Sequence, residues 1–204
     1  MIDIFEEQGI KVFEIDNALY PKLDGLFAEV NSMPVIVIGN YRPGDRQRFT
    51  LAHELGHLLL DNRIPLEMDI EIFCNRFAGA FLLPKQSLLN IFNTHRNFIE
   101  PRELSLIKQE YGISMTSILH RAEDLHIISN ELYRQLRSEF NVRGWSQHEP
   151  GKQYPKEKMH IFEQMIFHAL AEGFIGESKA AELMNMPIES FRSLRALDCQ
   201  DGND

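Results

Sequence analysis

The stretch that decides the fold of this chain is Phe49-Thr50-Leu51-Ala52-His53-Glu54-Leu55-Gly56-His57-Leu58-Leu59-Leu60. Most of its residues are apolar, and two histidines four positions apart flank a glutamate. Residues four apart lie on one face of an α-helix, about one turn from each other. Thr50 is a suitable N-cap. The sequence therefore predicts a helix over residues 51–60 that presents His53 and His57 together.

This pair of histidines has the spacing of a metal site. Zinc binds imidazole nitrogens at about 2.0–2.1 Å, and a catalytic zinc keeps one position open for water. Glu54 is offset by one residue, so its carboxylate can reach that water without binding the metal. We therefore predict that Glu54 is the general base, which takes a proton from the water and passes it to the leaving amine. Zn²⁺ is the expected cofactor, and Mn²⁺ is an alternative.

The His-Glu-x-x-His pattern arises by chance in only about 3% of chains of this composition. A long apolar helix is also a costly place to bury two histidines and a glutamate that have no partner. The pattern therefore favours a metal site over a helix with two surface histidines.

A third protein ligand is expected downstream. The acidic candidates are Asp61, Glu67, Asp69 and Glu71. Asp61 follows His57 on the same helix and recedes along its axis, and the next two fall in or near a loop. Glu71 occupies the first turn of a second predicted helix, over about 69–83, and a helix hairpin would bring it against both histidines. Asn75, one turn later, is placed to accept a hydrogen bond from a ligand histidine and fix its tautomer.

The segments before the zinc helix predict strands at residues 10–15, 26–30 and 35–38, the last two joined by a turn. We expect an α+β fold, with a small antiparallel or mixed N-terminal sheet packed on the zinc helix and a mostly helical C-terminal half. A free sheet edge beside the zinc helix, from 35–38 or its hairpin partner, could hold an extended peptide by backbone pairing.

The second half of the chain predicts helices interrupted by one break. Four residues mark helix ends: Pro101, Gly112, Ser114 and Ser129. The expected divisions are a peptidase core over 1–100, a helical extension over 101–140, a linker over 141–155 and a C-terminal helical segment with a polar tail over 156–204. Residues 102–125 and 177–194 each have a helix-turn-helix order, for which helices packed on the peptidase are the favoured interpretation.

Composition limits the possible partners and the location. The formal net charge of −9 and the lack of a dense basic run make direct nucleic-acid binding unexpected. The N-terminal residues have no basic and apolar signal pattern, and the apolar stretches are too short for a bilayer. Cys74 and Cys199, far apart in the chain, are expected to be reduced thiols. A cytoplasmic location is therefore expected.

Residues 46–59, 71–78 and 82–84 together resemble the ImmA/IrrE family of metallopeptidases, as do shorter matches at 9–12, 34–37, 111–114 and 143–150. This resemblance implies a gluzincin with His53, His57 and Glu71 on zinc and Glu54 as the catalytic acid. Family members typically cut a cognate helix-turn-helix repressor and so release genes of a mobile element or a stress response. Cys74 departs from the family pattern, in which alanine is usual.

Three functions are compatible with these observations. The first is a narrow-specificity zinc endopeptidase that acts on a repressor encoded nearby. The second is a regulatory protein that binds the repressor without cutting it and keeps zinc for folding, and the third is a toxin-like partner in a two-gene module. Glu54 favours the enzyme, because a structural zinc does not need a general base. An oxyanion-stabilising residue could be another histidine, Tyr41 or Tyr111, among which the sequence does not choose.

Overall fold

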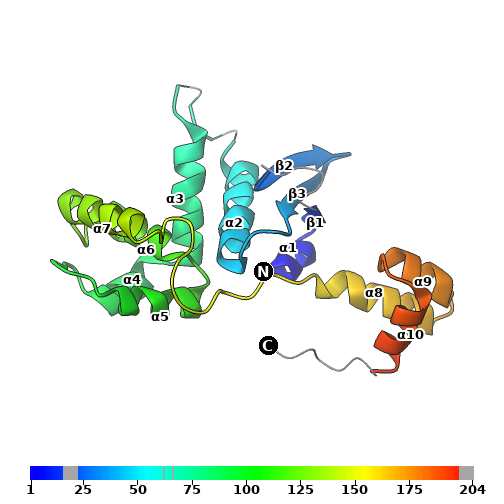
Figure 1. The fold of residues 1–204 in the computed structure, drawn as a ribbon. Coiled ribbons are helices and arrows are strands. Elements are labelled where there is room, and N and C mark those ends of the chain that lie inside the picture. Colours follow the sequence, from blue (N-terminus) through cyan, green and yellow to red (C-terminus); the bar gives the residue numbers. More distant parts are fainter. Residues whose placement is uncertain (16–22, 62, 66, 198–204) are drawn as a thin grey trace. The chain divides into compact units, whose positions relative to one another are not determined.

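The structure is a computed structural model that describes residues 1–15, 23–61, 63–65 and 67–197 (Figure 1). The described residues form three strands and ten helices: α1 (Ile2–Glu7), β1 (Lys11–Ile15), β2 (Gly25–Val30), β3 (Met33–Gly39), α2 (Gly44–Leu60), α3 (Ile70–Leu82), α4 (Lys85–Phe92), α5 (Pro101–Tyr111), α6 (Met115–Asp124), α7 (Asn130–Val142), α8 (His160–Ala171), α9 (Glu177–Leu183) and α10 (Ile188–Arg195). The predicted α+β class is confirmed. None of the described helices is both long and apolar enough to cross a membrane.

The three strands form a mixed sheet in the order β1-β3-β2. β3 runs parallel to β1 and antiparallel to β2, with Lys11 opposite Val35 and Gly25 opposite Ile38. Asn31 and Ser32 join β2 to β3 with φ values of 52° and 63°, the left-handed conformation of a tight hairpin turn. Because β3 is central, both of its edges are paired.

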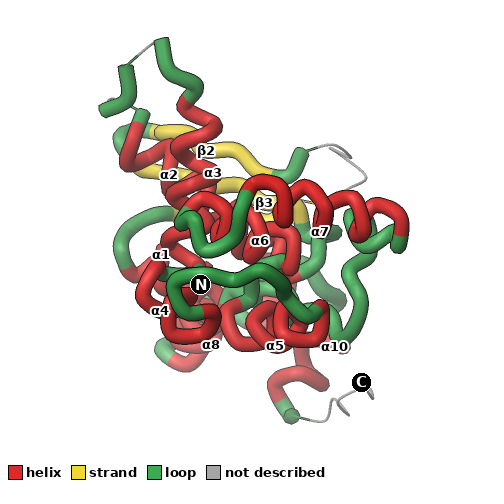
Figure 2. The backbone as a smooth tube through the Cα atoms, turned by 90° about the vertical axis from the view of Figure 1, so that its left-hand side faces the viewer, coloured by secondary structure: helices red, strands yellow, loops and turns green. Residues whose placement is uncertain are grey.

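α2 packs against the sheet through β2 and β3 (Figure 2). This helix begins at Gly44 with Pro43 as its N-cap, so the predicted start at Thr50 is wrong. Thr50 is instead a buried residue inside the helix. Asp45 lies in the first turn, where a carboxylate interacts favourably with the helix dipole, and it also pairs with Lys108.

The second helix of the site, α3, begins as predicted. The side chain of Asp69 caps it by accepting a hydrogen bond from the backbone N–H of Glu71 at 3.0 Å. α2 and α3 approach closely at Gly56, where a Cβ atom would lie 3.1 Å from the Cα of Cys74. A glycine at this crossing therefore allows the two helices to bring their side chains within reach of each other.

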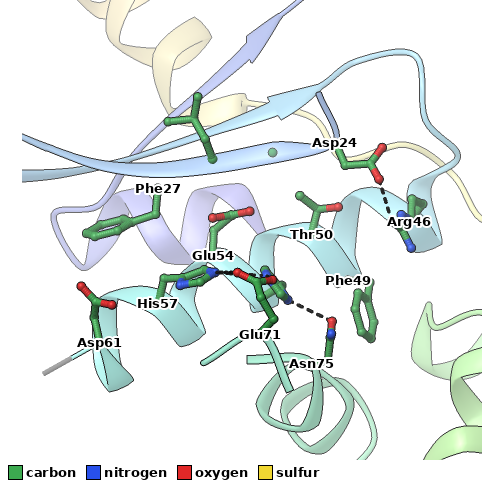
Figure 3. A pocket seen from close by; sticks show the side chains of 13 residues that line it. Asp24, Phe27, Arg46, Phe49, Thr50, Glu54, His57, Asp61, Glu71 and Asn75 are labelled. Carbon is green, nitrogen blue, oxygen red and sulfur yellow. Dashed lines mark hydrogen bonds and ion pairs between the residues drawn. The ribbon is translucent and has the colours of Figure 1, made fainter. Parts of the chain in front are cut away.

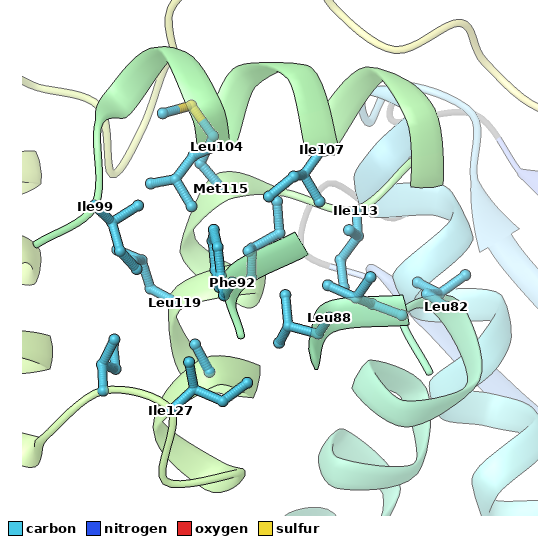
Figure 4. Packing of buried hydrophobic residues seen from close by; sticks show 14 of the residues in the cluster. Leu82, Leu88, Phe92, Ile99, Leu104, Ile107, Ile113, Met115, Leu119 and Ile127 are labelled. Atoms are coloured by element: carbon cyan, nitrogen blue, oxygen red, sulfur yellow. The ribbon is translucent and has the colours of Figure 1, made fainter. Parts of the chain in front are cut away.

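A large apolar core lies in the helical half of the chain, and Ala52 of α2 also belongs to it (Figure 4). Helices α3 to α7 contribute to it, and Phe92, Leu104, Met115 and Leu119 are almost completely buried. The predicted helix ends are confirmed: Pro101 opens α5, Gly112 ends it in the left-handed conformation, and Ser114 and Ser129 cap α6 and α7.

Residues 141–157 belong to the first of two compact units, Met1–Glu157 and Lys158–Asp204. Glu149 accepts hydrogen bonds from the Lys108 side chain and from the backbone N–H groups of Met115 and Thr116. The segment predicted as a linker is thus bound to the rest of the first unit by polar contacts. The second unit contains α8, α9 and α10, which pack around a small cluster that includes Ile166 and Phe191.

Candidate metal centre

His57 projects from α2 toward Glu71, which lies in the first turn of α3 (Figure 3). His53, one turn earlier on α2, also contacts Glu71. The two Nε2 atoms of the histidines are 3.2 Å apart. One carboxylate oxygen of Glu71 lies 3.1 Å from the Nε2 of His53, and the other lies 3.2 Å from the Nε2 of His57. The structure therefore brings together the three residues that the sequence predicts as ligands.

The spacing of these donor atoms matches that of a zinc ligand set. At bond lengths of about 2.0–2.1 Å, neighbouring ligands of a tetrahedral zinc ion are about 3.3–3.4 Å apart. The separations of 3.1–3.2 Å between His53, His57 and Glu71 lie close to this value. Two imidazole nitrogens and a carboxylate are also the donor types of catalytic zinc. The residues present therefore fit a zinc ion with a fourth position open.

Asn75 lies one turn after Glu71 and orients the first histidine. Its Oδ1 is 3.0 Å from the Nδ1 of His53, which donates to it. A proton on Nδ1 leaves Nε2 of His53 with a free lone pair. This nitrogen faces the Nε2 of His57 and the carboxylate of Glu71. Burial, together with the charge of His57, lowers the pKa of His53 despite the opposing effect of Glu71. A neutral imidazole is the form that binds a metal.

Glu54 lies between α2 and the sheet, beside the triad (Figure 3). Its side chain is buried, with only 7% of the residue exposed. Burial is the largest effect and raises the pKa of Glu54, and the charge of Glu71 raises it further. The charge of His57 and a hydrogen bond from the backbone of Phe27 partly offset this rise. A carboxylate with a raised pKa is a stronger base and a better proton carrier near neutral pH.

Gly25 of β2 makes this arrangement possible. A Cβ atom on Gly25 would lie 2.3 Å from the Cγ2 of Thr50 and 3.2 Å from the Oε1 of Glu54. Any side chain there would force β2 away from α2 or displace Thr50. The close approach of strand and helix therefore requires a glycine beside the predicted base.

The triad opens into a cleft of about 650 Å³ between β2, α2 and α3. It is lined by Asp24, Gly25, Leu26, Phe27, Arg46, Phe49, Thr50, His53, Glu54, His57, Asp61, Glu71 and Asn75. Three of these residues, Asp24, Gly25 and Arg46, are not among the site residues predicted from the sequence. Arg46 could have been found from its spacing, seven residues before His53, if the early start of α2 had been recognised.

The two tyrosines considered as oxyanion-stabilising residues do not line this cleft. Neither Tyr41 nor Tyr111 is among its lining residues, and the Tyr41 hydroxyl donates to the backbone of Leu23. A second group of possible metal ligands, formed by His120, Glu123 and Asp124, also has converging donor atoms. Its carboxylates are held by Arg76 and by the amide of Asn130, so we assign it no metal.

A helix with two converging histidines, a facing glutamate on the next helix and a buried glutamate beside them define the site of a metallopeptidase. The profile of the Peptidase_M78 family, described as the IrrE N-terminal-like domain, matches residues 5–123. The chain belongs to this family, whose members are metallopeptidases and so use a metal cofactor.

Two individual proteins are also similar. The first is the radiation response metalloprotease IrrE of Deinococcus radiodurans, which is 39% identical over a match that covers 30% of this chain and 22% of that protein. This chain thus matches only about a fifth of the length of that relative. The second is a solved structure of a Mycobacterium tuberculosis transcriptional regulator, with 17% identity, a TM-score of 0.45, and coverage of 60% of this chain and 39% of that one.

Proposed function

We propose that this protein is a zinc-dependent endopeptidase of narrow specificity that cleaves a helix-turn-helix transcriptional repressor. The main support for this proposal is the convergence of His53, His57 and Glu71, whose donor atoms are separated by distances that suit the ligands of one zinc ion. Glu54 is buried beside them. Family membership supports the same activity.

His53, His57 and Glu71 would hold the metal, and Asn75 would fix the tautomer and orientation of His53. When bound, zinc supplies Lewis acidity, which lowers the pKa of water in the site and polarises the scissile carbonyl. Mn²⁺ is the alternative ion for the same ligands.

Glu54 would act as the proton carrier. As a carboxylate it accepts a proton from the attacking water, and as a carboxylic acid it gives that proton to the leaving amine. Its burial and the neighbouring charge of Glu71 raise its pKa, which favours the protonated state between these two steps. The hydrogen bond from the backbone of Phe27 holds its carboxylate at the cleft.

The free edge of β2 is the proposed peptide-binding strand. The N–H of Gly39 donates to the carbonyl of Asp24, so this pair is hydrogen-bonded across β2 and β3. Hydrogen-bonded and non-hydrogen-bonded pairs alternate along an antiparallel ladder. Gly25 and Phe27 therefore turn their backbone groups away from β3, toward the cleft that they line. An extended substrate would pair with the backbone groups of Gly25 and with the carbonyl of Phe27, whose N–H is bound to Glu54. The alternative edge predicted at residues 35–38 is wrong, because β3 is central.

The repressor as substrate is supported by the family resemblance of the zinc helix. The printed name of the Deinococcus relative, a radiation response metalloprotease, supports a role in a stress response. A substrate with an exposed extended segment fits a cleft in which β2 supplies the pairing edge.

Cleavage of the repressor encoded beside this gene tests the proposal. Wild-type and Glu54→Gln proteins are incubated with it, their zinc content is measured, and the products are identified by mass spectrometry. We expect equal zinc in both and cleavage by the wild type alone, with a loss of about 10²–10⁴-fold in the variant. Equal cleavage by both would refute the role of Glu54. Zinc and repressor binding without cleavage by either protein would support the non-proteolytic alternative.

A further inference from the structure

One end of the cleft carries a positive charge that the proposed chemistry does not use. Asp24 accepts hydrogen bonds from Arg42 and Arg46, each at 2.6 Å. Burial alone would raise the pKa of Asp24, but the two arginines lower it below its ordinary value. Asp24 is therefore ionised at neutral pH. One carboxylate between two guanidinium groups leaves one positive charge without a partner in this cluster.

Arg46, rather than Arg42, presents this charge to the cleft. Arg46 is the only Lys or Arg among the described residues that line the cleft. Arg42 does not line it, and its guanidinium lies over the ring of Tyr41, 4.8 Å from the centroid. The Arg46 side chain is 53% exposed. Asp24 thus holds an accessible guanidinium in place, and an arginine fixed in this way loses less entropy when it binds an anion.

The charges along the cleft are unequally distributed (Figure 3). Arg46 lies in the first turn of α2, near its N-terminus, whereas Asp61 lies just past the C-terminal end of the same helix. The helix dipole adds partial positive charge at the first end and partial negative charge at the other. The end with Arg46 therefore favours an acidic group, and the end with Asp61 disfavours one.

The position of Arg46 determines which part of a substrate it can reach. Arg46 is seven positions before His53, which corresponds to about 10 Å along the helix axis. An extended peptide advances about 3.3 Å per residue. A guanidinium at this distance reaches a side chain two or three residues from the scissile bond.

We propose that Arg46 is a specificity-determining residue that binds an acidic side chain of the substrate, two or three residues from the scissile bond. This inference rests on the proposed function and names a feature of its substrate. One N–H group of Arg46 is bound to Asp24. Within the described part of the chain its remaining donors are available to a carboxylate, for which a guanidinium is geometrically suited.

Peptide selection on the full chain, made inactive by Glu54→Gln and loaded with zinc, tests the inference. A displayed library of random twelve-residue peptides is selected on this protein and on the same protein with Arg46→Gln or Arg42→Gln. Arg42→Gln is the matched control, because it also removes one arginine from Asp24 but does not alter the cleft lining.

We expect Asp or Glu to be enriched at one position by the parent and, more weakly, by Arg42→Gln, in which Asp24 neutralises Arg46 alone, but not by Arg46→Gln. A selected peptide should bind the parent about tenfold more tightly than its Glu-to-Gln counterpart, as measured by calorimetry, and Arg46→Gln should abolish this ratio. A library without acidic enrichment, or enrichment that persists in Arg46→Gln, would overturn the inference.

Cleavage of the selected peptides by the wild type separates this inference from the proposed function. Cleavage two or three residues from the acidic position supports both. Peptides that show the Arg46-dependent preference but remain uncut would count against the proposed peptidase and leave Arg46 as the acid-binding residue. Cleavage next to the acidic position, or far from it, would refute the stated distance.

Discussion

The Nδ1 atom of His53, on α2, donates a hydrogen bond to the Oδ1 atom of Asn75, on α3, across 3.0 Å. This contact joins the two helices that carry the candidate ligands. It also selects the tautomer of His53 whose Nε2 lone pair faces His57 and Glu71. The orientation of one ligand therefore depends on a residue that does not itself contact the metal.

Replacing Asn75 with alanine should weaken metal binding. Loss of the hydrogen bond frees the His53 ring and its tautomer, and such losses lower metal affinity about 10–100-fold. Zinc affinity is measured by competition with a chromophoric chelator. Asn90→Ala in α4, whose amide hydrogen-bonds Gln86 instead, is the control and should keep wild-type affinity. An unchanged affinity for Asn75→Ala would show that His53 is oriented by other contacts.

Replacing Gly25 with alanine should reduce catalysis while zinc stays bound. The new Cβ atom would overlap Thr50 Cγ2 and approach the Glu54 carboxylate, and a shift of about 1 Å in a catalytic group costs on the order of 100-fold in rate. Adding Thr50→Ser removes the overlapping methyl group and should restore part of kcat/KM. Gly176→Ala, where a Cβ atom meets nothing within 4 Å, is the control. Loss of zinc from Gly25→Ala would contradict this explanation.

Replacing Lys108 with methionine should destabilise the first unit. The ammonium group is 2.9 Å from Asp45 and 2.9 Å from Glu149, and its side chain is 2% exposed. Removing it leaves two buried carboxylates without their cation, which costs about 3–5 kcal/mol. Denaturant unfolding measures the loss, and Lys85→Met at an exposed position should change the free energy of unfolding by under about 0.5 kcal/mol.

The contribution of Lys108 should depend on pH in the alkaline range. Burial alone would lower its pKa, but Glu149 and Asp45 together raise it above the ordinary value of 10.5. A raised pKa in the folded state adds stability that is complete below 10.5 and is lost as the pH rises through the folded-state value. The difference in unfolding free energy between wild type and Lys108→Met should therefore shrink above pH 10.5. A difference that grows there would contradict this pairing.

Cys74 should be unreactive in the folded protein. Burial, and then the charges of Glu71, Glu54 and Asp61, raise the pKa of its thiol to about 11. Only the thiolate reacts rapidly with alkylating reagents. Iodoacetamide at mildly alkaline pH should therefore leave Cys74 unmodified in the native protein and label it after unfolding, as read by peptide mass mapping. Rapid labelling of the native protein would show that this side chain becomes exposed.

The start of α2 shows where pattern analysis reaches its limit. Residues 44–49 are mostly polar, so the periodic apolar pattern indicates a helix only after Thr50. In the structure, Asp45 pairs with Lys108, and the side-chain oxygen of Gln47 accepts a hydrogen bond from the backbone N–H of Glu157. Because their partners are distant in sequence, these polar residues are buried at positions where a local pattern predicts exposure.

The segment 141–155 is also held in place by contacts with residues far away in the chain. Its glycines and prolines indicate a break in helical structure, and α7 does end at Val142. However, Glu149 binds Lys108 and caps the N-terminus of α6. Charge pairing between residues this far apart leaves no periodic pattern in the sequence. A segment bound to the rest of the protein and a free linker can therefore have the same composition.

The sequence by itself determined the local features: the helical face shared by His53 and His57, the position of Glu54 between them, the start of α3 and the ends of α5, α6 and α7 that Pro101, Gly112, Ser114 and Ser129 mark. These depend on the fixed period of a helix and on residues a few positions apart. Only the tertiary structure decided that β2 is an edge strand of the described sheet, that Gly25 lies against Thr50 and that Arg46 faces the cleft. Those features depend on strand order and helix packing, which arise from contacts between residues far apart in the chain.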